Sequence, residues 1–212
     1  MTTLLLIRHG ESEANRHGIF AGQINPDLQE EGVKQAELTA EYIAENYKVD
    51  KVYASDLTRA YRTGECVAKR MGLSLETDKN LREINAGDWE GVLFTELPEK
   101  YPEDFNMWMT DMGRAHPTNG ESVRELGDRV MAALTKIALE NDGSCVAVAT
   151  HATPIRAVQS IMETGSVDGM SKIHYVSNAS VTILTFDGEW KLEAVGIDEH
   201  LGALKTALPT NF

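Results

Sequence analysis

Two kinds of apolar pattern alternate along the chain. Short, largely apolar runs at residues 4–7, 51–54 and 145–150 predict strands buried within a sheet. Apolar positions with helical spacing cover residues 28–47, 55–71, 121–139 and 154–162. Residues 181–186 and 191–195 predict a hairpin that turns at Asp187-Gly188. This order predicts an α/β fold, a three-layer α/β/α sandwich around a mostly parallel sheet.

Several helix and strand boundaries carry local signals. Residues 27–30 have the form of a capping box, so we assign the cap of the first long helix to Asp27. Ser55 or Asp56 is expected to cap the next helix, and Gly72 to end it. Pro154 suits the first turn of a later helix, and residues 73–76 are expected to form an edge strand.

The pattern loosens over residues 84–120. Prolines interrupt short helical stretches there, and four large aromatic residues gather: Trp89, Phe94, Phe105 and Trp108. We interpret this segment as an excursion that covers a site, and its tryptophans and Phe94 as candidates for an apolar pocket wall. No repeat or linker is visible, so residues 1–212 are predicted to form one domain with a covering excursion at about 84–120.

Composition narrows the class of partner. The formal net charge of −13 disfavours nucleic acid and anionic membrane surfaces, both of which need a basic face. We expect no signal peptide after Met1, because neither a basic region nor a small-residue cleavage site is seen, and no apolar stretch approaches the length of a membrane span. We expect Cys66 and Cys145 to be reduced thiols of a cytoplasmic protein, either a monomer or a homodimer.

Polar residues follow the three apolar runs at equivalent places. Arg8 and His9 end the first run, Arg59 lies soon after the second, and His151 ends the third. In a parallel sheet these strand ends meet at one edge, close to helix N-termini. Because guanidinium groups match phosphate oxygens in bidentate geometry, the cluster predicts a site for an anion such as phosphate.

Five sequence segments resemble, in order, the motifs of the histidine phosphatase superfamily, also called the phosphoglycerate mutase-like family. They are LIRHGESEAN, SDLTRAYRTGE, LREINAGDWEG, PTNGES and THATPIR. The resemblance spans residues 4–156 and implies a phosphoglycerate mutase-like fold. It also implies a metal-independent enzyme without a cofactor that acts on a small phosphorylated metabolite. The sequence shows neither HExxH nor CxxC spacing that would suggest a metal.

The resemblance implies a role for each matched residue. His9 would be the nucleophile, Glu83 the proton donor to the leaving oxygen, and Arg8, Arg59 and His151 would hold the phosphoryl oxygens. Asn15 would add a hydrogen bond, and Ala21, Gly22 and Ala152 would lie against the substrate. A covalent phosphohistidine would divide one difficult displacement into two easier ones.

Three positions depart from the family pattern. Ala152 replaces the usual glycine, Ala21 replaces a small hydroxyl residue found in mutases, and Gln29 replaces a helix-capping threonine. We expect the alanine at 152 to change the geometry modestly without loss of activity.

Hydrolysis is the favoured reaction. Ile84, Asn85 and Ala86 follow Glu83 where cofactor-dependent phosphoglycerate mutases have Arg-His-Tyr, and the excursion has little positive charge to hold a second phosphate. A broad-specificity phosphatase is therefore predicted. A mutase and an alpha-ribazole phosphatase remain alternatives, and a non-catalytic phosphometabolite binder is disfavoured because all six matched positions carry the active residue type.

Overall fold

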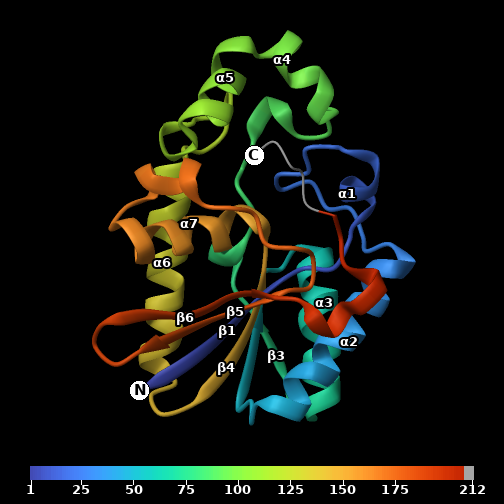
Figure 1. Ribbon diagram of the computed structural model, residues 1–212, viewed down its shortest axis with the longest axis vertical. Coiled ribbons are helices and arrows are strands. Elements are labelled where there is room, and N and C mark those ends of the chain that lie inside the picture. The colour runs from blue at the N-terminus through green and yellow to red at the C-terminus, as the bar shows by residue number, and fades with distance from the viewer. Residues whose placement is uncertain (208–212) are drawn as a thin grey trace.

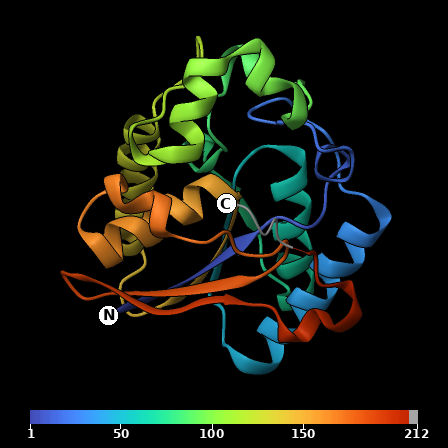
Figure 2. The same cartoon turned by 45° about the horizontal axis from the view of Figure 1, so that its top comes forward.

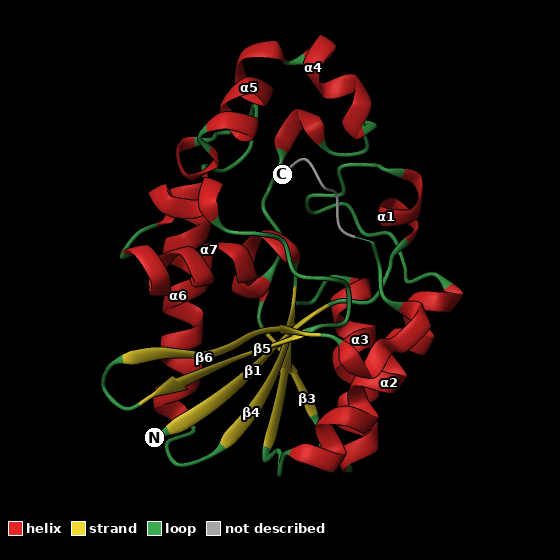
Figure 3. Cartoon of the chain, in the orientation of Figure 1, coloured by secondary structure: helices red, strands yellow, loops and turns green. Residues whose placement is uncertain are grey.

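The computed structural model describes residues 1–207, in which a central sheet is flanked by helices (Figures 1 and 3). The strands are β1 (Thr2–Arg8), β2 (Lys51–Ala54), β3 (Leu75–Thr77), β4 (Cys145–Thr150), β5 (Val181–Phe186) and β6 (Trp190–Ile197). The helices are α1 (Glu13–His17), α2 (Glu30–Asn46), α3 (Thr58–Met71), α4 (Leu97–Lys100), α5 (Pro102–Thr110), α6 (Val123–Glu140) and α7 (Ala152–Thr164). No helix in this part of the chain is long and apolar enough to cross a membrane.

The strands lie in the order β3-β2-β4-β1-β5-β6. The first four strands in the chain, β1 to β4, run parallel, and β5 pairs antiparallel with both β1 and β6. The predicted mostly parallel sheet and the hairpin are thus confirmed, and the edge strand expected at residues 73–76 is present but lies at Leu75–Thr77.

Helices cover both faces of the sheet, which explains why the apolar run of β1 is unbroken. Leu4 and Leu6 pack in a cluster with apolar residues of α6 and α7, whereas Leu5 and Ile7 pack in a cluster with residues of α2 and α3. Successive side chains of a strand point to opposite faces, so a strand covered on both faces needs an apolar residue at every position.

The predicted helix caps are wrong in two places. α2 begins after Gln29, whose side chain makes no capping bond, and the Asp27 carboxylate is instead bound to Arg62. α3 begins after Leu57 rather than after Ser55 or Asp56, and the side chain of Asn25 accepts a hydrogen bond from the first helical N–H group. Gly72 ends α3 in the left-handed conformation, as predicted.

The covering excursion lies beyond the carboxyl ends of the parallel strands, with α4 and α5 at the top of the molecule (Figures 1 and 2). It is tied by backbone hydrogen bonds to the loop after α1. Phe20 exchanges N–H and carbonyl bonds with Val92 and Gly91, and the N–H of Phe94 donates to the Gly18 carbonyl. The excursion is therefore anchored to the loop at residues 18–20, which lies between α1 and α2.

A close backbone approach fixes the turn after β1 against α2. A Cβ atom on Gly10 would lie 2.2 Å from the Gly32 carbonyl oxygen, and one on Gly32 would lie 2.0 Å from the Glu11 carbonyl oxygen. Both positions therefore need glycine, because any side chain would overlap the opposing backbone. This contact holds the residue after His9 at a fixed place.

Candidate active site

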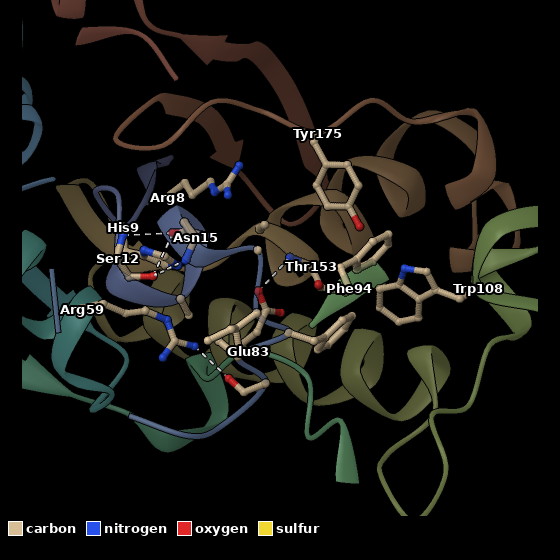
Figure 4. Close-up of a pocket in the computed structure, with 17 residues that line it drawn as sticks. Arg8, His9, Ser12, Asn15, Arg59, Glu83, Phe94, Trp108, Thr153 and Tyr175 are labelled. Atoms are coloured by element: carbon tan, nitrogen blue, oxygen red, sulfur yellow. Dashed lines mark hydrogen bonds between the residues drawn. The ribbon is translucent and has the colours of Figure 1, made fainter. Parts of the chain in front are cut away.

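A pocket of about 380 Å³ opens where the carboxyl ends of the strands meet the covering excursion (Figure 4). Most of the predicted site residues line it, namely Arg8, His9, Asn15, Ala21, Gly22, Arg59, Glu83 and Ala152. His151 does not line the pocket itself. It is fully buried behind the lining residues, and its ring centroid lies 5.1 Å from that of His9. The structure therefore brings together all the residues that the sequence motifs singled out.

The orientation of the His9 ring follows from its backbone neighbour. The Nδ1 atom lies 2.7 Å from the Gly10 carbonyl oxygen, which can only accept a hydrogen bond. Nδ1 must therefore carry the proton in the neutral ring, and Nε2 keeps its lone pair. Nε2 has no hydrogen-bond partner among residues 1–207, so it is the nitrogen available to a ligand in the pocket.

The surroundings keep the His9 ring neutral. The pKa of His9 lies well below its usual value of 6.5. The main cause is burial of the ring, and the positive charges of Arg59 and Arg8 lower the pKa further. Burial lowers the pKa of Arg59 to about 10, so this guanidinium is still charged at neutral pH. A neutral imidazole beside charged guanidinium groups combines a nucleophilic nitrogen with a site for an anion.

This arrangement predicts the pH behaviour of His9. Because its pKa is lowered, the ring should stay neutral as the pH falls through 6.5 and should gain a proton only in more acidic solution. We expect an NMR titration of the ligand-free protein to show His9 signals unchanged where a model-peptide histidine titrates. A midpoint at or above 6.5 would contradict the environment described here.

In both pocket arginines, Arg8 and Arg59, a terminal guanidinium nitrogen donates to a backbone carbonyl group, whereas the Nε atom has no hydrogen-bond partner within residues 1–207. Arg59 donates from Nη1 and Nη2 to the Ile24 and Gly22 carbonyls, and Arg8 donates from Nη1 to the Val176 carbonyl. The Nε atoms of both arginines are buried and have no hydrogen-bond partner in the described chain. Buried donors without partners are costly, so these two atoms are candidate donors to an anion in the pocket.

Glu83 lies at the N-terminus of α7. Its carboxylate accepts hydrogen bonds from the backbone N–H groups of Ile84 and, at 3.3 Å, Thr153. Arg129 and Gln23 both donate to the Glu83 carbonyl oxygen and so fix its backbone. Glu83 is the one carboxylate that lines this pocket within residues 1–207, which makes it the candidate for proton transfer.

The wall opposite the arginines is aromatic. Phe20, Phe94, Trp108 and Tyr175 line it, and Phe20 contacts Trp108 edge to face at 5.3 Å between ring centroids. The expectation that the excursion contributes Phe94 and Trp108 is confirmed. Trp89 does not reach the pocket, since it is fully buried and packs beneath Phe20 and Trp108.

The alanine that departs from the family motif at 152 and the matched residue Asn15 have simple structural surroundings. Ala152 opens α7 and is not among the non-glycine residues with positive φ, so its Cβ causes no backbone strain. Asn15 uses its Oδ1 atom to accept from Ser12 and Asn178, which leaves its amide N–H groups to donate elsewhere.

Sequence reasoning missed Tyr175, which lines the pocket on the same side as Phe94 and Trp108 (Figure 4). The guanidinium carbon of Arg156 lies 4.2 Å from the centre of the Tyr175 ring, and Arg156 also donates to the Ile173 carbonyl. Tyr175 stands in an irregular segment with no periodic pattern. The available sequence signal is Arg156 at the end of the THATPIR motif, because an arginine in a buried helix needs a partner such as an aromatic ring.

The fold and the site together define the class of protein. Residues 4–198 match the histidine phosphatase superfamily, branch 1, and the chain belongs to this superfamily. Among solved structures, YhfR of Bacillus stearothermophilus superimposes with a TM-score of 0.89 at 27% identity, covering 95% of this chain and 100% of that one.

Two curated relatives have names that state an activity. Phosphoserine phosphatase 1 of Hydrogenobacter thermophilus is 36% identical over 158 residues, which make up 74% of each chain. The metal-independent phosphoserine phosphatase of Arabidopsis thaliana is 33% identical over 207 residues, covering 96% of this chain and 85% of that protein. The superfamily predicted from the sequence motifs is thereby confirmed.

Proposed function

We propose that this chain is a metal-independent phosphatase that hydrolyses phosphate monoesters of small metabolites through a phosphohistidine on His9. One observation carries the proposal. Arg8, Arg59 and His151 surround His9, and each has a buried nitrogen without a hydrogen-bond partner in residues 1–207. A phosphoryl group on His9 offers oxygen acceptors to all three nitrogens.

The proposed reaction has two displacements. In the first, the His9 Nε2 lone pair forms a bond to phosphorus while the bond from phosphorus to the leaving oxygen breaks. Glu83 gives its proton to that oxygen, so that an alcohol leaves. In the second, Glu83 takes a proton from water, whose oxygen attacks phosphorus and releases His9 and inorganic phosphate. Fixed donors on Arg8 and Arg59 stabilise the charge on the equatorial oxygens in both steps.

The lining of the pocket favours hydrolysis over a mutase reaction. A mutase must hold a second phosphate and reorient a doubly phosphorylated intermediate. Arg8 and Arg59 are the two arginines that line the pocket, no lysine within residues 1–207 lines it, and the opposite wall is aromatic. A lining of this kind favours substrates whose leaving group carries no negative charge of its own. Phosphoserine, after which two relatives are named, does not fit that description because its leaving group has a carboxylate. An alpha-ribazole phosphatase activity is the second candidate, because alpha-ribazole is a bulky aromatic leaving group that would suit the aromatic wall of the pocket.

A substrate panel tests the proposal. We expect the protein to release phosphate from aryl and alkyl phosphates, and to favour those with apolar leaving groups over phosphoserine and 3-phosphoglycerate in kcat/KM. Transfer of phosphate between positions of a phosphoglycerate at a rate exceeding its hydrolysis would instead establish the mutase. Absence of turnover with tight binding of a phosphometabolite would identify a binding protein.

Metal chelation and vanadate provide an independent prediction. We expect activity to survive dialysis against EDTA, since the arginine and histidine donors supply the charge neutralisation that other phosphatases obtain from metal ions. Orthovanadate should inhibit competitively, because it resembles the transferred phosphoryl group. Loss of activity after chelation, restored by a divalent cation, would exclude this mechanism.

We also propose that the protein works in the cytoplasm, as a monomer or a homodimer. Both cysteines are free and half-buried, and burial raises the pKa of each thiol, that of Cys145 to about 11. Protonated thiols that form no disulfide suit a reducing compartment.

A further inference from the structure

The surroundings of Ser55 determine which nitrogen of His151 carries a proton. Ser55 is fully buried at the end of β2, and its Oγ atom lies 2.8 Å from His151 Nε2. The same Oγ accepts a hydrogen bond from the Leu57 N–H group at 3.3 Å. Among residues 1–207, no other group than His151 Nε2 offers an acceptor to the Ser55 hydroxyl hydrogen.

Hydrogen-bond accounting then gives one arrangement. The His151 ring is neutral, because burial and the charge of Arg59 hold its pKa well below 6.5. A neutral imidazole has one N–H group and one lone pair. If Nε2 carried the hydrogen, Ser55 would receive two N–H groups and its own buried O–H would have no acceptor, which is costly. Ser55 therefore donates to Nε2, and the proton lies on Nδ1.

His9 and His151 thus have the same tautomer, but His9 offers a lone pair to the ligand whereas His151 offers an N–H group. In His9 the protonated Nδ1 is bound to the Gly10 carbonyl, and the bare Nε2 is available for attack. In His151 the bare Nε2 is bound to Ser55, and the protonated Nδ1 is buried without a partner. Backbone oxygen fixes the first ring, and a side-chain hydroxyl fixes the second.

We propose that Ser55 is a positioning residue that makes His151 a neutral hydrogen-bond donor to the phosphoryl group on His9. This inference rests on the proposed function. A neutral donor suits the site because Arg8 and Arg59 already place two positive charges there. In a buried site, a fixed donor aimed at a developing charge contributes strongly to catalysis. The opposite tautomer would present a lone pair to the phosphoryl oxygens and repel them.

NMR of the ligand-free wild-type protein with isotope-labelled histidine tests the proton position directly, since protonated and bare ring nitrogens differ widely in chemical shift. We expect a protonated Nδ1 and a bare Nε2 in His151, whose signals are assigned by their loss in His151→Gln. In Ser55→Ala the proton should move to Nε2 in part or in full. Ser160→Ala, which removes an equally buried hydroxyl bound to the Ser166 carbonyl, should leave the His151 signals unchanged.

Kinetics test whether the proton position matters. Ser55→Ala should lower kcat/KM by about 10- to 100-fold, the scale of losing a partner that orients a functional histidine. In the His151→Gln background the same change should cost nothing further, because Ser55 acts through His151. An equal loss in both backgrounds, or a wild-type His151 that carries its proton on Nε2, would overturn the proposal. A protein that hydrolyses no phosphate ester would refute the proposed function instead, and the proton position would still be measured without turnover.

Discussion

Replacement of His9 by alanine is expected to abolish turnover, with kcat falling by roughly 10⁶-fold, the order of loss found when a covalent nucleophile is removed. The change deletes Nε2, the one ring nitrogen of His9 that is not bound to the Gly10 carbonyl. The fold should persist, because the β1 strand that precedes His9 is held by β4 and β5. Circular dichroism and thermal unfolding, measured beside the phosphatase assay, separate loss of chemistry from loss of structure.

Trapping identifies the nucleophile in the wild-type protein. Brief exposure to a radiolabelled phosphate ester followed by denaturation should leave label on the peptide that contains His9, labile in acid and stable in base. His17→Ala is the matched control, since the His17 side chain is exposed and, within residues 1–207, bonds only to the Glu13 carbonyl. It should retain wild-type activity and labelling. Label on another residue, or rapid hydrolysis by His9→Ala, would show that the nucleophile is misassigned.

Glu83→Gln is expected to affect substrates unequally. An alkyl phosphate expels an alkoxide that must be protonated, so loss of Glu83 should lower kcat/KM by about 10²–10⁴-fold. A nitrophenyl phosphate expels a stable phenolate, so its loss should be much smaller. The comparison must use kcat/KM, which reports the steps up to the first irreversible one, because slower hydrolysis of the phosphohistidine would lower kcat for every substrate.

The phosphoenzyme gives a second measurement for Glu83. With the aryl substrate, Glu83→Gln should accumulate phosphohistidine, since water is no longer activated for the second step. Glu13→Gln is the control, because Glu13 is exposed and does not line the pocket. Equal proportional losses for both substrate types would mean that another acid donates the proton. Glu11 and Asp88 also lie outside the lining and would then need a different path to the leaving oxygen.

The sequence predicted which side chains would lie together where these side chains follow apolar strands. Arg8, His9 and His151 come directly after the ends of apolar runs, and parallel pairing brings such ends together at one edge of the sheet. Glu83 follows no such strand, and periodicity alone could not place it. Its position came only from a resemblance between motifs, and its geometry depends on the N-terminus of α7 and on Arg129, both distant in the sequence.

The features that were missed depend on tertiary contacts. Asp27 has the spacing of a helix cap, yet Arg62 from the neighbouring helix binds its carboxylate. Arg59 is held by two carbonyl groups of the loop at 22–24, and backbone groups carry no sequence signature. Tyr175 reaches the pocket from an irregular segment, where neither a period of two nor one of 3.6 applies.

The central position of β1 has a consequence for how the protein is made. Leu5 pairs with Ala147 on one side and Ile183 on the other. Neither neighbour exists until the ribosome has synthesised most of the chain, so the first apolar strand to emerge is among the last to be paired. Until then its leucines are open to other unfolded chains, the condition in which unpaired apolar strands aggregate. His9, at the end of that strand, likewise gains its backbone partners Thr150 and Ala179 only when the last parallel strand and the segment before β5 are in place.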